Sequence, residues 1–352
     1  MKRVLASGAL LVATVALALA LGEVAVRLVL KEQTVMYPRY HTDYRYGEYT
    51  LRGIRANAEF WHTSTDGRWK FVTNSKGLRD AREFPYAKPA GTLRVLALGD
   101  SHTQGYEVRQ EATFSAVLER YLNVHLPARG MKAEVLNAGV SGFSTAEAVA
   151  YLESEGHRYE PDVVVLGFFA NDYEDNLKAG LFGLEGGKLV ARKREHIPGV
   201  RTQNAIYAVP GVKWLSENSY FYSVLFNTVW LYTKTLAAAH AKEEAVDYAV
   251  ATKQQSKYDV ELAAALVERM QRFCESRGIR FVVVDIPQAV APYQFASSIL
   301  FSKDFEVIGS RGLLGQFGGA AEVHLPHGHN HISEFTHALI GAELGKRILE
   351  KK

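Results

Sequence analysis

The feature that most constrains the fold is a series of short apolar runs, each followed by a helical pattern. The strongest run spans Asp162–Phe169. Three similar runs are Arg94–Leu98, Glu134–Leu136 and Ile279–Ile286. Consecutive apolar residues are typical of strands that are buried on both faces. Residues 114–122 and 260–274 carry apolar side chains at helical spacing between these runs. The alternation predicts a mostly parallel sheet with helices on both sides.

The N-terminus predicts a membrane segment. Lys2 and Arg3 precede an uncharged run, Val4–Gly22, which as a helix is about 28 Å long and so matches the hydrocarbon thickness of a bilayer. The two cations predict a cytoplasmic N-terminus, with the rest of the chain outside the cytoplasm. Ala18–Ala20 also suits a cleaved signal peptide, but the run is longer than most such segments, and we favour an uncleaved single-pass anchor.

The composition excludes several classes of protein. The 352 residues include 41 Lys and Arg against 38 Asp and Glu, so there is no positive excess of the size that nucleic-acid binding requires. The one cysteine, Cys274, rules out an internal disulfide framework and a cysteine-based zinc site. We therefore expect a globular protein with no nucleic-acid partner.

The pattern divides the chain into three parts. Residues 1–30 form the expected anchor, residues 31–90 lack sustained periodicity, and residues 91–352 hold the strand–helix alternation. We therefore expect an irregular juxtamembrane segment that packs on one α/β domain. The alternation stops at about residues 177–257, which we interpret as an insertion. Its aromatic run, Tyr220–Tyr232, suits either a helix packed on the core or a substrate lid or membrane-contacting surface.

Three candidate site residues directly follow three of the expected strands. Ser101 follows the first, Gly139 the second and Asn171 the third. Because the carboxyl ends of parallel strands share one edge of the sheet, we expect these residues to converge there. Each alone suits an ordinary helix cap or turn. Together they indicate a serine nucleophile beside backbone and side-chain amides that hold an oxyanion.

A histidine cluster lies near the C-terminus. Five of the 12 histidines fall within 14 residues, namely His324, His327, His329, His331 and His337. A serine hydroxyl needs a base to take its proton, and histidine is best matched to neutral pH. The crowding also suits a metal site, but no cysteine or acidic cluster accompanies it. We favour a general base and expect no metal and no cofactor.

In their order along the chain, these motifs resemble the SGNH/GDSL hydrolase superfamily. The blocks are Gly99-Asp-Ser101, Asn137-Ala-Gly139, Ala170-Asn-Asp172 and a late histidine before a terminal helix. The chain is most similar to membrane-anchored bacterial members, in which a segment like Asn74-Ser-Lys-Gly-Leu-Arg-Asp80 follows the N-terminal helix. The resemblance implies a flavodoxin-like three-layer α/β/α sandwich that hydrolyses esters through an acyl-serine intermediate.

The resemblance also implies a role for each residue. Ser101 is the nucleophile, its amide with Gly139 and Asn171 forms the oxyanion hole, and His331 is the general base, with His329 as a minor variant. The family usually has an aspartate two or three residues before the base, where this chain has His329 and Gly328. Either a backbone carbonyl orients the base, or Asp172, Asp285 or Glu322 supplies the carboxylate, or the activity is weakened or lost.

We therefore expect a serine esterase anchored in the bacterial inner membrane, with its main domain periplasmic or extracellular. Its partner is an acyl-ester substrate on a carbohydrate or a lipid. The alternatives are an O-acyltransferase that uses the same site, and a non-catalytic carbohydrate-binding or assembly protein on the same fold.

Overall fold

The structure is a computed structural model that describes residues 2–36, 38, 40–244, 257–288, 305–317, 321–327 and 331–350. The chain divides into two compact units. Unit 1 comprises residues 1–39, 60–68 and 205–250, and unit 2 comprises residues 40–59, 69–204 and 251–352. The candidate site residues all belong to unit 2.

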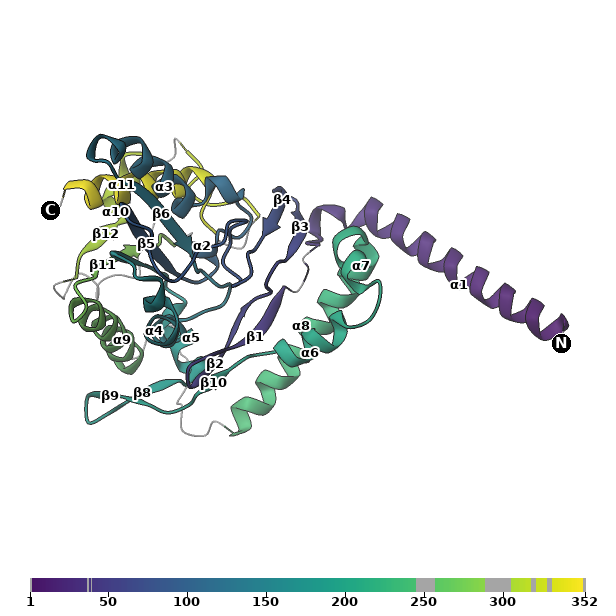
Figure 1. The fold of residues 1–352 in the computed structure, drawn as a ribbon. Coiled ribbons are helices and arrows are strands. Elements are labelled where there is room, and N and C mark those ends of the chain that lie inside the picture. Colours follow the sequence, from purple (N-terminus) through teal and green to yellow (C-terminus); the bar gives the residue numbers. More distant parts are fainter. Residues whose placement is uncertain are drawn as a thin grey trace. The chain divides into compact units, whose positions relative to one another are not determined.

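A five-stranded parallel sheet forms the centre of unit 2 (Figure 1). Its strands are β5 (Thr92–Gly99), β6 (Lys132–Asn137), β7 (Val163–Phe168), β11 (Arg280–Asp285) and β12 (Val307–Gly309). They lie in the order β12-β11-β7-β5-β6, and every neighbouring pair is parallel. Numbered along the chain, this is the flavodoxin-like order 2-1-3-4-5. The predicted parallel sheet is confirmed, and each of the four apolar runs is one of its strands.

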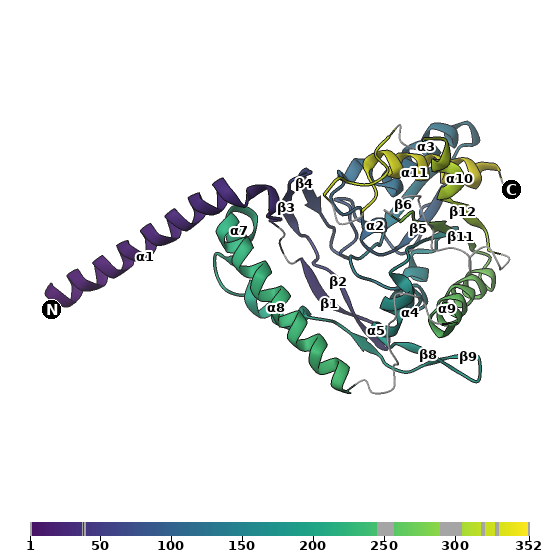
Figure 2. The ribbon, with the colours of Figure 1, turned by 180° about the vertical axis from the view of Figure 1, so that it is seen from behind.

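Helices cover both faces of this sheet. Figures 1 and 2 show α3 (Phe114–His125) and α11 (Glu334–Glu350) together on one face. The other face carries α4 (Thr145–Ser154), α5 (Asp172–Ala179) and α9 (Lys257–Glu275). The predicted three-layer α/β/α arrangement is therefore present.

The core beneath α3 and α11 is made of branched side chains from the sheet. Val95, Val165, Val282 and Val284 are fully buried, and they form one cluster with Leu118 and other helix residues. Burying a side chain of this size stabilises the fold by roughly 1.5–3 kcal/mol. Such burial on both faces explains why these strands read as continuous apolar runs rather than alternating ones.

Residues 31–90 contain four strands, and our expectation of an irregular segment was wrong. The strands are β1 (His41–Tyr46), β2 (Tyr49–Ile54), β3 (Glu59–Ser64) and β4 (Gly67–Val72). β1 pairs antiparallel with β2, and β3 is hydrogen-bonded to β4. Their side chains are mostly Tyr, Arg, Thr and Trp, which combine apolar bodies with polar ends. An apolar–polar alternation is therefore not visible in the sequence, although β1 and β3 alternate in burial.

The expected insertion, residues 177–257, contains short elements. They are β8 (Phe182–Glu185), β9 (Lys188–Ala191), β10 (Glu195–His196), α6 (Val200–Tyr207), α7 (Val212–Asn218) and α8 (Tyr220–Glu244). β10 pairs in parallel with β2, which the sequence did not predict. The other short elements are α2 (Ser101–Gln104), α10 (Ser310–Leu314) and 3₁₀ turns at Lys31–Gln33, Gln110–Ala112, Pro127–Arg129, Gly156–Tyr159 and Gly315–Phe317.

Unit 1 consists mainly of helices, includes most of β3, and contains the N-terminal segment. Its first helix, α1 (Lys2–Val29), contains the stretch Arg3–Val29, which is long and apolar enough to cross a membrane. None of the most apolar part of α1 is buried. The predicted aromatic run lies in α8, and α1 and α8 contact one another.

Candidate active site

Ser101 stands on a tight turn at the end of β5. Gly99 ends this strand with φ of 145°, and a Cβ there would lie 2.3 Å from Thr103 Oγ1, so the turn requires glycine. Asp100 then caps α2 by accepting a 2.8 Å hydrogen bond from His102 N. The helix ends after one turn at Gly105, where φ is 83°. The turn therefore holds Ser101 at the carboxyl edge of the sheet, next to the switch point between β5 and β7.

His331 meets Ser101 across 230 positions of sequence. Its Nε2 lies 2.8 Å from Ser101 Oγ, within hydrogen-bond distance. The backbone at His331 is fixed, because its carbonyl accepts a 2.9 Å hydrogen bond from Leu325 N. The next residue, Ile332, is fully buried and forms a β-bridge with His324. The other predicted base, His329, lies outside the described residues.

Two rings lie against the imidazole of His331. The Tyr106 ring stacks on it with the centroids 4.4 Å apart, and the His102 ring lies at 4.8 Å. His102 in turn contacts the Phe169 ring at 4.2 Å. Burial, with a smaller contribution from the charge of nearby His324, lowers the pKa of His102 to about 3. His102 is therefore neutral at physiological pH and does not repel a proton on His331.

A buried carboxylate, Asp100, directly precedes the serine. Asp100 is 1% exposed, and besides the bond from His102 N it receives one from Asn171 Nδ2 at 3.4 Å. Burial raises the pKa of Asp100 above its ordinary value, whereas the His102 amide and the charge of His331 act in the opposite direction. That attraction is mutual, so an ionised Asp100 favours the protonated form of His331.

The amide of Gly139 is already engaged. It donates a 3.1 Å hydrogen bond to Asn137 Oδ1, and Gly139 is buried. A Cβ at this position would lie 2.3 Å from Gln104 N, so glycine is needed here for close packing on α2. The expectation that Gly139 donates to the oxyanion is corrected on this ground, because its hydrogen is used within its own loop.

Gly142 and Asn171 each have an N–H hydrogen available to donate. Within the described part of the chain, no atom accepts a hydrogen bond from Gly142 N–H, and Gly142 is half-buried with φ of 80°. Its loop is tied to β5 by a 3.0 Å bond from Val140 N to Gly99 O. The Arg52 side chain donates to the Gly142 carbonyl. Asn171 bonds Asp100 through Nδ2, which carries a second hydrogen.

Two of the other clustered histidines have structural contacts. Phe114 N donates a 3.1 Å bond to Nδ1 of buried His337, and His324 Nε2 donates to the Pro287 carbonyl at 2.9 Å. Burial holds the pKa of His337 well below its ordinary value. Among the residues that the structure describes, no group of three His, Cys, Asp or Glu side chains is arranged to hold a metal ion.

The three carboxylates that we considered as substitutes for the missing aspartate differ in their surroundings. Asp172 accepts bonds from Thr145 N at 2.6 Å and Phe169 N at 2.9 Å, so it holds two loops together. Glu322 is exposed. Asp285 is fully buried at the end of β11. The pKa of Tyr173 is raised mainly by burial and, to a smaller extent, by the charge of Asp285. The charge of His331 acts on the pKa of Asp100, so these two groups interact electrostatically.

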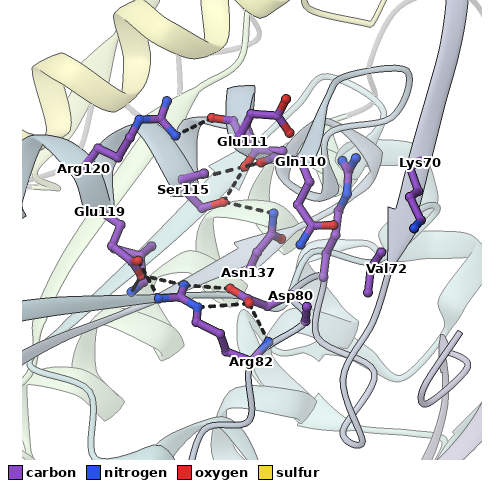
Figure 3. A pocket seen from close by; sticks show the side chains of 15 residues that line it. Lys70, Val72, Asp80, Arg82, Gln110, Glu111, Ser115, Glu119, Arg120 and Asn137 are labelled. Carbon is purple, nitrogen blue, oxygen red and sulfur yellow. Dashed lines mark hydrogen bonds and ion pairs between the residues drawn. The ribbon is translucent and has the colours of Figure 1, made fainter. Parts of the chain in front are cut away.

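Arg79, in the segment 74–80, is hydrogen-bonded to the turn that carries the nucleophile. Arg79, 3% exposed, donates to the carbonyls of Gln104 at 2.7 Å, Val108 at 2.6 Å and Gly105. Burial lowers its pKa to about 10, which still leaves it charged. Figure 3 shows a cavity of about 420 Å³ in front of this segment, where Arg82 is paired with Asp80 and Glu119. Neither Ser101 nor His331 lines this cavity, so we do not assign it to the catalytic site.

Four residues around Ser101 were not predicted as site residues, namely Asp100, His102, Tyr106 and Gly142. Asp100 belongs to one of the motif blocks that identified the site, Gly142 lies three residues after another block, and His102 and Tyr106 follow the serine within five positions. These residues lie in or near the motifs, but their roles could not be predicted, because ring contacts and an unused amide hydrogen depend on side-chain and loop geometry.

Replacing His102 with Asn is expected to flatten the acid side of the stability profile. The pKa of His102 is about 3 in the folded chain against 6.5 ordinarily, so below pH 6.5 protons bind only the unfolded state. This stabilising contribution is present above pH 6.5 and is lost as the pH falls. From pH 7.5 to 5 the free energy of unfolding should fall about 2 kcal/mol more in the wild type than in His102→Asn. Equal slopes in urea unfolding would contradict a neutral, buried His102.

Comparisons with known proteins identify the family of this chain. The model of the GDSL-like Lipase/Acylhydrolase family matches residues 97–299, which is more than half of the chain. No curated protein matches. Among solved structures, a lipase/acylhydrolase from Enterococcus faecalis shares 18% identity over 73% of this chain and 95% of its own, with a TM-score of 0.37.

Two esterase structures are also similar. An acetyl-xylooligosaccharide esterase from Geobacillus Stearmophilus, solved as a mutant, shares 11% identity over 73% of this chain and 93% of its own, with a TM-score of 0.40. A two-domain esterase active on acetylated mannans shares 12% identity over 74% of this chain, with a TM-score of 0.42. This chain covers only 50% of that protein.

The substrates of these two enzymes are properties of those proteins. The family match itself includes the nucleophile turn and the loops after β6 and β7. It confirms the resemblance that the motif blocks indicated: the chain belongs to the GDSL-like lipase/acylhydrolase family and is an ester-bond hydrolase.

Proposed function

We propose that this protein is a membrane-anchored serine esterase that removes a small acyl group from a carbohydrate or lipid outside the cytoplasm. The observation that carries the proposal is the 2.8 Å contact between His331 Nε2 and Ser101 Oγ at the carboxyl edge of the sheet. A neutral imidazole at this distance is placed to take the serine proton as the hydroxyl attacks an ester carbonyl.

The oxyanion of the tetrahedral intermediate needs donors that are already in place. The Ser101 amide is in the first turn of α2, where backbone N–H groups have no partner within the helix. Asn171 supplies the second hydrogen of its Nδ2, and we assign the third donor to Gly142 instead of Gly139. As the intermediate collapses, His331 returns the proton to the leaving alcohol. A water molecule, activated by His331 in the same way, then attacks the acyl-serine and releases the acid.

We assign to Asp100 the charge that the family usually supplies from just before the histidine. During acylation His331 becomes an imidazolium, and a nearby anion stabilises it. Asp100 is held in position by the His102 amide, and it interacts with His331. The rings of Tyr106 and His102 both contact the imidazole, which restricts its rotation. This arrangement accounts for a working base without an aspartate at position 328 or 329.

The proposed location rests on α1. A helix of this length and apolar character suits a membrane anchor, and the cations before it favour a cytoplasmic N-terminus. The acyl acceptor is then either water or a hydroxyl of an extracytoplasmic polymer. Which of them reacts depends on which reaches the acyl-serine. The experiment below, with an added sugar acceptor, distinguishes hydrolysis from acyl transfer.

Replacing Ser101 with Ala or His331 with Asn is expected to reduce hydrolysis of p-nitrophenyl acetate by at least about 10³-fold. The first variant removes the nucleophile, and the second removes its base. The double variant should lose no more activity than either single one, because the two groups act in one step. Initial rates of the full-length protein in detergent measure both effects.

The matched control is His125→Asn, which changes an exposed histidine on α3. It should retain the wild-type rate. Adding a sugar acceptor separates the two reactions, since a transferase forms acyl-sugar at the expense of free acetate. Undiminished hydrolysis by Ser101→Ala would refute the proposal and favour a binding protein.

Asp100→Asn is expected to lower kcat by about 10- to 100-fold, because the imidazolium of His331 loses a negative charge that stabilises it. The asparagine oxygen still accepts from His102 N, so the turn is retained. Without the anion, His331 gives up its proton more readily, and the acid limb of the kcat/KM profile should move to lower pH. A profile and kcat equal to those of the wild type would show that Asp100 has no part in the reaction.

A further inference from the structure

The helix α8 exposes one apolar stripe. The stripe consists of Leu225, Thr228, Val229 and Tyr232, which recur at helical spacing and therefore lie on one side. Leu225 is 54% exposed, Val229 53% and Tyr232 65%. No charged residue occurs from Tyr220 to Tyr232. A helix side that faces water ordinarily carries charged or polar residues, so this stripe suits an apolar partner.

The opposite side of α8 is already packed inside unit 1. Ser223 is 4% exposed, and Asn227 Nδ2 donates a 3.1 Å hydrogen bond to the Val35 carbonyl. Ser223 and Asn227 are one helical turn apart, on the side away from Leu225 and Val229. Up to Asn227, the side of α8 away from the stripe is therefore fixed inside unit 1, and the stripe is the outward side.

The start of α8 is fixed to α1 where the uncharged run ends. The Glu23 carboxylate accepts bonds from Ser219 Oγ at 2.7 Å, Tyr220 N at 3.1 Å and Phe221 N at 3.0 Å. The Phe221 ring packs on Gly22, where a Cβ would lie 3.1 Å from its carbons. If Val4–Gly22 spans the hydrocarbon layer, the first turn of α8 lies at the boundary between lipid and water.

From this point α8 runs crosswise to α1 in both views (Figures 1 and 2). Phe221, Leu225 and Val229 are four residues apart and follow one side of the helix. The side that packs on α1 therefore continues as the stripe. A helix that leaves a membrane span crosswise, with this side exposed, lies along the bilayer surface.

Tryptophan is concentrated in the same unit. Trp61, Trp214 and Trp230 are three of the four tryptophans of the chain, and all three belong to unit 1. Trp214, on α7 just before α8, is 64% exposed. Tryptophan and tyrosine are enriched at the level of the lipid headgroups, where an apolar ring and a polar N–H or O–H are both accommodated.

We propose that the α8 stripe, with Trp214, inserts into the headgroup region of the phospholipid bilayer that α1 crosses. The stripe forms a second attachment, fixed to the anchor through Glu23. This inference rests on the anchoring part of the proposed function and does not involve Ser101 or His331.

The test places a fluorophore on the stripe in the full-length protein. Val229→Cys is compared with Val124→Cys, an exposed valine on α3 of unit 2 that is 76% exposed. The native Cys274 is fully buried, and burial raises its pKa to about 12, so the wild type serves as the unlabelled blank. Each variant is labelled with a nitrobenzoxadiazole maleimide and reconstituted into vesicles of phosphatidylcholine and phosphatidylglycerol.

A spin-labelled phospholipid should quench the probe at position 229 several-fold more than the probe at position 124, and aqueous iodide should show the reverse order. Equal quenching at the two positions would overturn the proposal, because the stripe would then face water. Protection of position 229 from both quenchers would also overturn it, because protein, such as a second copy of the chain, would then cover the stripe.

Extraction of the same vesicles with alkaline carbonate tests the anchor separately. If the chain remains in the membrane and position 229 is not quenched by lipid, only the stripe proposal fails. If carbonate releases the chain and position 229 was quenched, the stripe is supported and the anchor fails. If carbonate releases the chain and position 229 was not quenched, both fail.

Discussion

The hydrogen bond between His331 and Ser101 is the interaction on which the proposed chemistry of unit 2 depends. It joins two positions 230 residues apart, and each end is fixed by different parts of the fold. The serine end depends on the turn at Gly99 and on Arg79, which holds the carbonyls that close this turn. A displacement of about 1 Å between reacting groups costs roughly 10²-fold in rate, so both supports bear on activity.

The histidine end depends on helix packing. The chain enters α11 three residues after His331, and α11 lies unusually close to α3. A Cβ on Gly341 would lie 2.7 Å from Phe114 O, and one on Gly345 would lie 2.3 Å from the Tyr121 ring. These two glycines let the helices approach closely, and the position of His331 follows from this approach. The core on that face and the geometry of the site are therefore linked through the same helix pair.

The sequence was sufficient for the sheet and for the convergence of Ser101, Asn171 and His331 on one side of it. Buried parallel strands have a strong local signal, and a parallel sheet brings their carboxyl ends together. The sequence was insufficient where the assignment of a donor depended on the direction of a single N–H bond. Gly139 and Gly142 lie three residues apart in the same loop, and only the loop conformation shows that Asn137 already receives the Gly139 hydrogen. The strands β1 to β4 were missed because Tyr and Arg side chains conceal a period of two.

The central claim, that Ser101 is an activated nucleophile, is tested most directly by reaction of the full-length protein with a fluorophosphonate, followed by peptide mass spectrometry. The probe forms a covalent bond only with a serine whose proton is removed and whose developing anion is stabilised. The account predicts one stoichiometric adduct, on Ser101, which is lost when His331 is replaced by Asn. An unmodified Ser101 under conditions in which the protein hydrolyses esters, or an adduct that persists without His331, would contradict it.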